Sequence, residues 1–189
     1  MKELEQFLQR AEAVLARVEA MLPAAAPEVD WTAHAFRWRV SRDGRGRLQA
    51  VHHPSRIRLE DLRNIGPQKK AIEQNTRQFI KGLPSNNVLL TGARGTGKSS
   101  LIKACLAQFS HQGLRLIEVD KEHLVDLPDI VEMVGARTER FIIFCDDLSF
   151  EEGEGGYKAL KVALDGSIAT QSDNVLIYAT SNRRHLLPE

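Results

Sequence analysis

The chain of 189 residues has almost no net charge and no long apolar run. Its formal charge of +1 gives no overall attraction to nucleic acid or to an anionic membrane. No stretch approaches the roughly 20 apolar residues that a transmembrane helix needs. The acidic, polar N-terminus differs from a secretory signal. These features predict a cytoplasmic protein with no membrane partner.

Cysteine is also scarce, and one nucleotide-reading motif is missing. Cys105 and Cys145 are the two cysteines, and both lie in apolar segments without the spacing of a zinc site. We therefore expect buried free thiols in a reducing compartment. No Asn-Lys-x-Asp sequence occurs, which argues against a GTPase that reads guanine.

A glycine-rich loop with the pattern G-x-x-x-x-G-K-[ST] follows the short strand expected at residues 88–91. Its glycines let several backbone N–H groups point at one anion, and the helix expected after it adds its N-terminal dipole. In this pattern the lysine contacts the β- and γ-phosphates and the following hydroxyl holds Mg²⁺. The predicted nucleotide-binding residues are Gly92, Ala93, Arg94, Gly95, Thr96, Gly97, Lys98, Ser99 and Ser100.

Two carboxylates, Asp146 and Asp147, follow the apolar residues 141–145. Asp146 is the predicted partner of Ser99 at a magnesium ion, and Asp147 is placed to polarise the attacking water. The alternative is that these acids cap the following turn. Glu151 and Glu152 are further candidates for the base.

A third polar position, Asn182, follows the apolar residues 175–179. Ligands bind at the carboxyl ends of parallel strands, so Asn182 is a candidate sensor of the γ-phosphate or of the water. A simple Ser/Asn turn is the alternative.

From residue 87 onward, short apolar strands alternate with helical patterns, which predicts a parallel α/β sheet with right-handed crossovers. An earlier helix is expected over residues 67–81. The expected strands are 88–91, 114–119, 141–145 and 175–179, and the expected helices are 97–112, 121–134 and 157–169.

The N-terminal part has a different pattern. Residues 1–22 show apolar positions at heptad spacing, which predicts a helix that docks on its own domain or pairs with a partner. Residues 31–40 and 47–52 predict a β-hairpin in which Phe36 and Trp38 alternate with arginines. That pattern fits either single-stranded nucleic acid or an ordinary strand face whose aromatic residues pack in the core.

The loop, the acids and Asn182 together resemble an AAA+ ATPase. The region from Trp31 onward is similar to a bacterial AAA+ family known as domain of unknown function 815. The resemblance implies ATP, Mg²⁺ and a three-layer sheet with strand order 5-1-4-3-2. It also places Ile65 and Gly66 near the adenine. We expect an N-terminal extension at 1–55 and a nucleotide-binding core at 56–189.

Two features depart from the AAA+ pattern. The acid pair is Asp-Asp where Asp-Glu is usual, which predicts slow hydrolysis. The sequence ends shortly after Asn182, so we expect the fifth strand, the arginine finger and the helical lid to be missing. The first core strand would then be an open sheet edge.

The leading functional hypothesis is a Mg²⁺-dependent ATPase that assembles with itself and acts on a macromolecule. A nucleotide-dependent switch or loader with little hydrolysis is the main alternative. A nucleic-acid-binding protein that uses the hairpin, and a small-molecule kinase, are the others. Lys98, Asp147 and Asn182 are the predicted catalytic residues.

Overall fold

The computed structural model describes residues 2–21, 28–150, 155–164 and 173–182. Its centre is a six-stranded sheet with the order β2-β1-β4-β5-β6-β3. β1 pairs with β2 in an antiparallel hairpin, and the other neighbours are parallel. The strands are β1 (Ala35–Val40), β2 (Gly46–Val51), β3 (Val88–Thr91), β4 (Leu114–Glu118), β5 (Arg140–Cys145) and β6 (Val175–Ser181).

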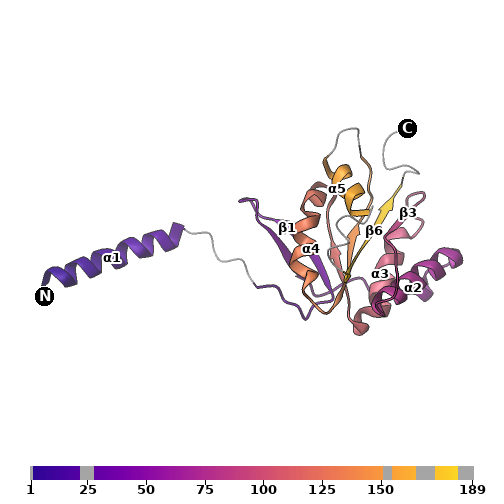
Figure 1. Cartoon of the computed structure of the whole chain (residues 1–189), viewed down its shortest axis with the longest axis horizontal. Helices are drawn as coiled ribbons and strands as arrows, with labels where there is room; N and C mark the ends of the chain where they lie inside the picture. The colour runs from indigo at the N-terminus through magenta and orange to yellow at the C-terminus, as the bar shows by residue number, and fades with distance from the viewer. Residues whose placement is uncertain (1, 22–27, 151–154, 165–172, 183–189) are drawn as a thin grey trace.

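Helices cover both faces of this sheet (Figure 1). α2 (Gly66–Ile80) and α3 (Lys98–Phe109) pack on one face, and α4 (Leu127–Gly135) and α5 (Gly155–Leu164) pack on the other. The first helix, α1 (Lys2–Met21), stands away from the sheet (Figure 1). Short 3-10 helices complete the chain at η1 (Leu59–Asp61), η2 (Ser110–Gln112) and η3 (Lys121–Asp126).

β5 shows how the sequence produces three layers. Phe141 and Ile143 belong to the hydrophobic core under α4 and α5, whereas Ile142 and Phe144 belong to the core under α2 and α3. Because successive strand residues point to opposite faces, a strand covered on both faces must be apolar throughout. The continuous apolar run before Asp146 therefore marks a central strand.

The predicted topology is confirmed. The order β3-β6-β5-β4 is the 1-4-3-2 part of the expected strand order, with β6 between β3 and β5. Within the described residues, β3 pairs with β6 alone and so lies at one edge of the sheet. This order brings the ends of β3, β5 and β6 together.

The N-terminal hairpin is part of the same sheet. β1 runs parallel to β4, with Ala35 opposite Leu116 and Arg37 opposite Glu118. One sheet therefore contains strands from both sides of residue 55. The division of the chain at that residue into an extension and a core stays a prediction.

The hairpin aromatic residues are buried, with Phe36 1% exposed and Trp38 2% exposed. The Trp38 Nε1–H donates to Asp126 Oδ2 at 2.9 Å. On the other face, the guanidinium group of Arg37 lies 2.9 Å from Glu118 Oε2. The suggestion that these rings stack on nucleic-acid bases is wrong, because their faces are inside the protein.

Several element boundaries differ from those expected, and two of the differences have a clear local cause. β1 begins at Ala35 rather than at residue 31, because Thr32 donates from its N–H and hydroxyl to Asp30 Oδ1 and forms a turn. The helix expected over 121–134 is a 3-10 helix followed by α4, since Pro128 fits only the first turn of an α-helix. Residues 165–169, at the end of the last expected helix, lie outside the described part of the chain.

Both cysteines are buried free thiols, as expected. Burial raises the pKa of Cys105 and of Cys145 to about 12. Both groups therefore stay protonated at neutral pH and are poor nucleophiles.

Gly46, at the start of β2, gives a test of the hairpin packing. A Cβ atom there would lie 1.9 Å from Cζ2 of Trp38, which is buried and held by Asp126. Gly46→Ala should lower the free energy of unfolding by about 1–3 kcal/mol, because the ring has no room to move. Urea denaturation, followed by tryptophan fluorescence, measures this change in the free energy of unfolding.

The matched control is Gly66→Ala, at the start of α2, where a Cβ meets no atom within 4 Å. This control should change the free energy of unfolding by less than about 0.5 kcal/mol. Equal stability of the two variants would show that the Trp38 ring does not lie against Gly46.

Candidate functional site: a phosphate loop facing two carboxylates

The glycine-rich loop joins the end of β3 to the start of α3. Gly95 and Gly97 have φ values of +78° and +85°. These are left-handed conformations, which glycine adopts without steric cost. Gly97 is the N-cap of α3, so the first turn of that helix starts directly beneath the loop. The local sequence therefore supplies both the curved backbone and the helix N-terminus of an anion site.

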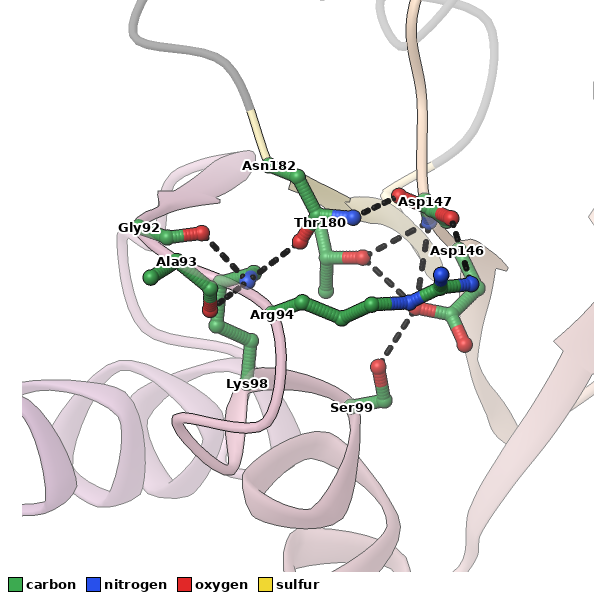
Figure 2. Close-up of polar contacts among 9 residues, drawn as sticks. All are labelled: Gly92, Ala93, Arg94, Lys98, Ser99, Asp146, Asp147, Thr180 and Asn182. Carbon is green, nitrogen blue, oxygen red and sulfur yellow. Dashed lines mark hydrogen bonds and ion pairs between the residues drawn. The ribbon is translucent and has the colours of Figure 1, made fainter.

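β6 holds the start of this loop against the end of the neighbouring strand. Thr91 pairs with Ser181, and the Gly92 N–H donates to the Ser181 carbonyl oxygen at 3.2 Å. Asn182 follows directly, which places its side chain beside the loop (Figure 2). Sheet pairing thus brings together residues that are about 90 positions apart in the sequence.

Lys98 is folded back over the loop. Its Nζ donates to the carbonyl oxygens of Gly92 at 2.6 Å and Ala93 at 2.9 Å, and to Asn182 Oδ1 at 2.8 Å. Thr96 donates from its hydroxyl to the same Ala93 oxygen at 2.9 Å. In this state, the Lys98 and Thr96 donors are hydrogen-bonded to carbonyl and amide oxygens of the protein. A bound phosphate group would compete for the same donors.

Asp146 is the centre of the opposite wall. Its Oδ1 atom accepts the hydroxyl of Ser99 at 2.5 Å, the hydroxyl of Thr180 at 2.6 Å and the N–H of Asp147 at 3.1 Å. The three donors come from α3, from β6 and from the residue that follows β5 (Figure 2). The carboxylate therefore ties the start of α3 to the ends of β5 and β6.

Asp147 adopts a left-handed backbone conformation, with φ of +51°, which is uncommon for a residue other than glycine. Its N–H donates to Thr180 Oγ1 at 2.8 Å, and the next N–H, of Leu148, donates to the Thr180 carbonyl oxygen at 2.7 Å. Its side chain accepts a hydrogen bond from Asn182 Nδ2 and lies 3.9 Å from the guanidinium group of Arg94. The strained backbone is thus held by β6 on one side and by the loop on the other.

These groups surround a cavity of about 300 Å³. Cationic and N–H donors line one side of it and carboxylates line the other, which is the arrangement that a phosphate and a divalent cation require. The lining residues are Arg94, Gly95, Thr96, Gly97, Lys98, Ser99, Ser100, Asp146, Asp147, Thr180 and Asn182.

The donor set fits Mg²⁺ better than a metal held by the protein alone. Among the described residues, no group of three or more His, Cys, Asp or Glu side chains is placed to hold a metal ion. Mg²⁺ in nucleotide sites is bound by one or two protein oxygens together with phosphate oxygens and water. The Ser99 hydroxyl and the Asp146 carboxylate, 2.5 Å apart, are two such oxygens.

The structure brings most of the predicted site residues together but leaves four outside the cavity lining. Two of them, Gly92 and Ala93, still contribute carbonyl oxygens that accept from Lys98. The other two are Ile65 and Gly66. Ile65 is the N-cap of α2 and Gly66 is its first residue. Their segment still approaches the loop, because Leu62 Cδ2 is 3.9 Å from the Cβ position at Gly97. Lys69 fixes the segment by donating to the carbonyl oxygens of Leu59 and Leu62. Glu151 and Glu152 lie outside the described residues.

Thr180 is the site residue that sequence reasoning missed. It is 1% exposed and contacts both acids, yet it stands two residues before Asn182 within a buried strand. The available signal was a hydroxyl residue at the carboxyl end of an otherwise apolar strand, and the sequence alone did not distinguish it from Ser181.

The strand order and the phosphate loop define the fold of AAA+ P-loop ATPases. A point mutant of the Thermotoga maritima Holliday junction branch migration motor RuvB has this fold, with a TM-score of 0.50 and 18% identity, over 70% of this chain and 44% of that one. Residues 31–189 match the family described as protein of unknown function (DUF815), and the chain belongs to that family.

Two other solved structures are similar. AMPPCP-bound DnaA from Aquifex aeolicus has a TM-score of 0.46 and 17% identity, over 68% of this chain and 42% of that one. PCH-2 from C. elegans has a TM-score of 0.42 and 20% identity, over 63% of this chain and 36% of that one. The chain thus spans less than half the length of these three structures. No curated protein matches it.

None of the helices in the described ranges has the length and apolar character needed to cross a membrane.

Proposed function

We propose that this chain is an ATP-binding AAA+ module that hydrolyses ATP with Mg²⁺ to act on a macromolecular partner. The observation that carries the proposal is the placement of Lys98 and Ser99 opposite Asp146, Asp147 and Asn182 around one cavity. Each of these side chains has the chemistry that its position in phosphoryl transfer requires.

The loop backbone and Lys98 would hold the triphosphate. On binding, the Lys98 ammonium group exchanges the carbonyl oxygens of Gly92 and Ala93 for oxygens of the β- and γ-phosphates. Mg²⁺, when bound, neutralises phosphate charge, and Ser99 and Asp146 are the residues that would hold it. Asp147 orients the attacking water and accepts its proton.

Asn182 can couple the binding of ATP to its hydrolysis. Its Oδ1 accepts from Lys98 while its Nδ2 donates to Asp147, so one amide links the lysine to the proposed catalytic base. Movement of Lys98 onto phosphate would release the amide oxygen, and Asn182 could then turn toward the γ-phosphate. We propose that Asp147 is restrained until nucleotide enters.

The switch with little hydrolysis is the second candidate, and the contacts of Asp147 favour it. That carboxylate is already engaged by Asn182 and is 3.9 Å from Arg94, and it is one methylene shorter than glutamate. A restrained, shorter base would give tight nucleotide binding with slow turnover.

Calorimetric titration with ATP and Mg²⁺, followed by measurement of phosphate release with and without DNA and RNA, tests the proposal. We expect micromolar binding of ATP and slow but measurable phosphate release. Binding without any release would support the switch. No binding of ATP, with Mg²⁺ present and the chain folded, would refute both.

Thr180 is predicted to act as a positioning residue for the two acids. Thr180→Val keeps the shape of the side chain but removes the hydroxyl that contacts Asp146 and Asp147, so kcat should fall by about tenfold with little change in KM. Steady-state kinetics would measure both constants. Thr180→Ser, which restores the hydroxyl, should recover most of kcat, and an equal loss in both variants would argue for a packing role.

A further inference from the structure

α1 has an exposed apolar stripe along its whole length. The stripe occupies three columns of a heptad, and its large side chains are between 47% and 85% exposed. An apolar face of this size on a helix is stable in water only when another surface covers it. Its members are Leu4, Phe7, Leu8, Val14, Leu15, Val18 and Met21.

The charges beside the stripe indicate what covers it. Glu5, Glu12 and Glu19 recur every seven residues on one side, and the matching row on the other side holds Glu3, Arg10 and Arg17. At 100° per residue, each row lies about 110° from the middle of the stripe. One flank of α1 is therefore acidic, and the opposite flank is basic from Arg10 onward.

This charge pattern is complementary to itself in one orientation. When identical helices pack in parallel, the left flank of one meets the right flank of the next, so acid meets base. In an antiparallel pair, like flanks meet and repel. From this geometry we infer that α1 packs in parallel against α1 of other copies of this chain, as a short coiled coil.

The inference goes beyond the proposed function, because it concerns an element outside the family match and uses no residue of the nucleotide site. It gives the chain a nucleotide-independent means of self-assembly. Parallel packing also places the linked sheets of the copies at the same end of the coiled coil.

Cysteine cross-linking of the full chain tests the orientation. Cys105 and Cys145 are buried, so an introduced cysteine is the accessible thiol within the described residues. Under mild oxidation, Met21→Cys and Leu4→Cys should each form a disulfide-linked dimer, because parallel packing brings equal positions together. The control Gln9→Cys, on the opposite face, should cross-link at least about tenfold more slowly.

Mixing the two variants distinguishes the alternatives. Residues 4 and 21 are about 25 Å apart along the helix, so the mixture should give no cross-link between unlike chains. Cross-linking confined to the mixture would show antiparallel packing and overturn the inference. Cross-linking no faster than that of Gln9→Cys would overturn it too, since another surface would then cover the stripe.

Charge reversal gives an independent readout. Replacing Glu5, Glu12 and Glu19 with lysine gives both flanks a net positive charge and should slow the Met21→Cys cross-link severalfold at low salt. Reversing Arg10 and Arg17 to glutamate in the same chain should restore it. An unchanged rate in the triple lysine variant would contradict the role of the flanks.

Discussion

Lys98→Ala is expected to weaken ATP binding by about 100-fold and to remove measurable hydrolysis. The estimate follows from losing a charged donor to phosphate, which contributes about 1.5–3 kcal/mol per hydrogen bond, at two phosphate groups. The same group stabilises negative charge as the phosphoryl group transfers, so the rate falls further. Calorimetry with ATP and Mg²⁺ and a phosphate-release assay measure the two effects.

The fold should survive this substitution. Lys98 donates to the carbonyl oxygens of Gly92 and Ala93, which are not fully buried, so water can replace the ammonium group. Lys70→Ala, which removes an exposed lysine from α2, is the matched control and should bind ATP normally. Unchanged ATP binding by the Lys98 variant would mean that nucleotide does not occupy this cavity.

The parts of the site that could be predicted from the sequence are those set by short-range pattern. Residues 92–99 specify the curve of the loop through local backbone preferences, and the run before Asp146 specifies a strand that is buried on both faces. Once the strands are parallel, residues that follow them must gather at one edge of the sheet. That reasoning could therefore predict three of the site residues, Lys98, Asp146 and Asn182.

Contacts between segments that are far apart in the sequence could not be predicted in the same way. The alternation of residues 35–40 is the same whether its aromatic face meets nucleic acid or a protein core. Only the pairing of β1 with β4, about 80 residues away, places Trp38 beside Asp126 and Arg37 beside Glu118. Thr180 is a similar case, because its importance arises from two acids that directly follow another strand, β5.

The same pairing changes how the arginines of the hairpin are interpreted. Arg37 lies 2.9 Å from Glu118, the last residue of β4, and Arg39 lies 3.6 Å from Asp120. These acids already neutralise part of the positive charge on the arginine-bearing face of the hairpin. Half-exposed ion pairs of this kind add little stability, but they compete with phosphate for the arginines. Any nucleic-acid contact of the hairpin would therefore rely on exposed residues near its turn, such as Arg42 and Arg47.

Asp147→Asn is expected to lower the rate of ATP hydrolysis by between about 100-fold and 10,000-fold while leaving ATP binding within about threefold of the parent chain. The amide cannot accept the proton of the attacking water, but it keeps an oxygen that accepts from Asn182. Asparagine also tolerates the left-handed conformation of this position, where φ is +51°. Phosphate release in single turnover, together with equilibrium ATP binding, separates the two effects.

Asp147→Glu is the control, because it keeps the carboxylate and changes only its reach. If Asp147 acts as the base, this variant should hydrolyse ATP within about tenfold of the parent rate, even though glutamate fits the left-handed backbone less well. Loss of hydrolysis in both variants would assign the effect to backbone strain, and full hydrolysis by Asp147→Asn would assign the proton to another group. A parent chain that already turns over as slowly as Asp147→Asn would instead identify the protein as a switch, since removing an idle base changes nothing.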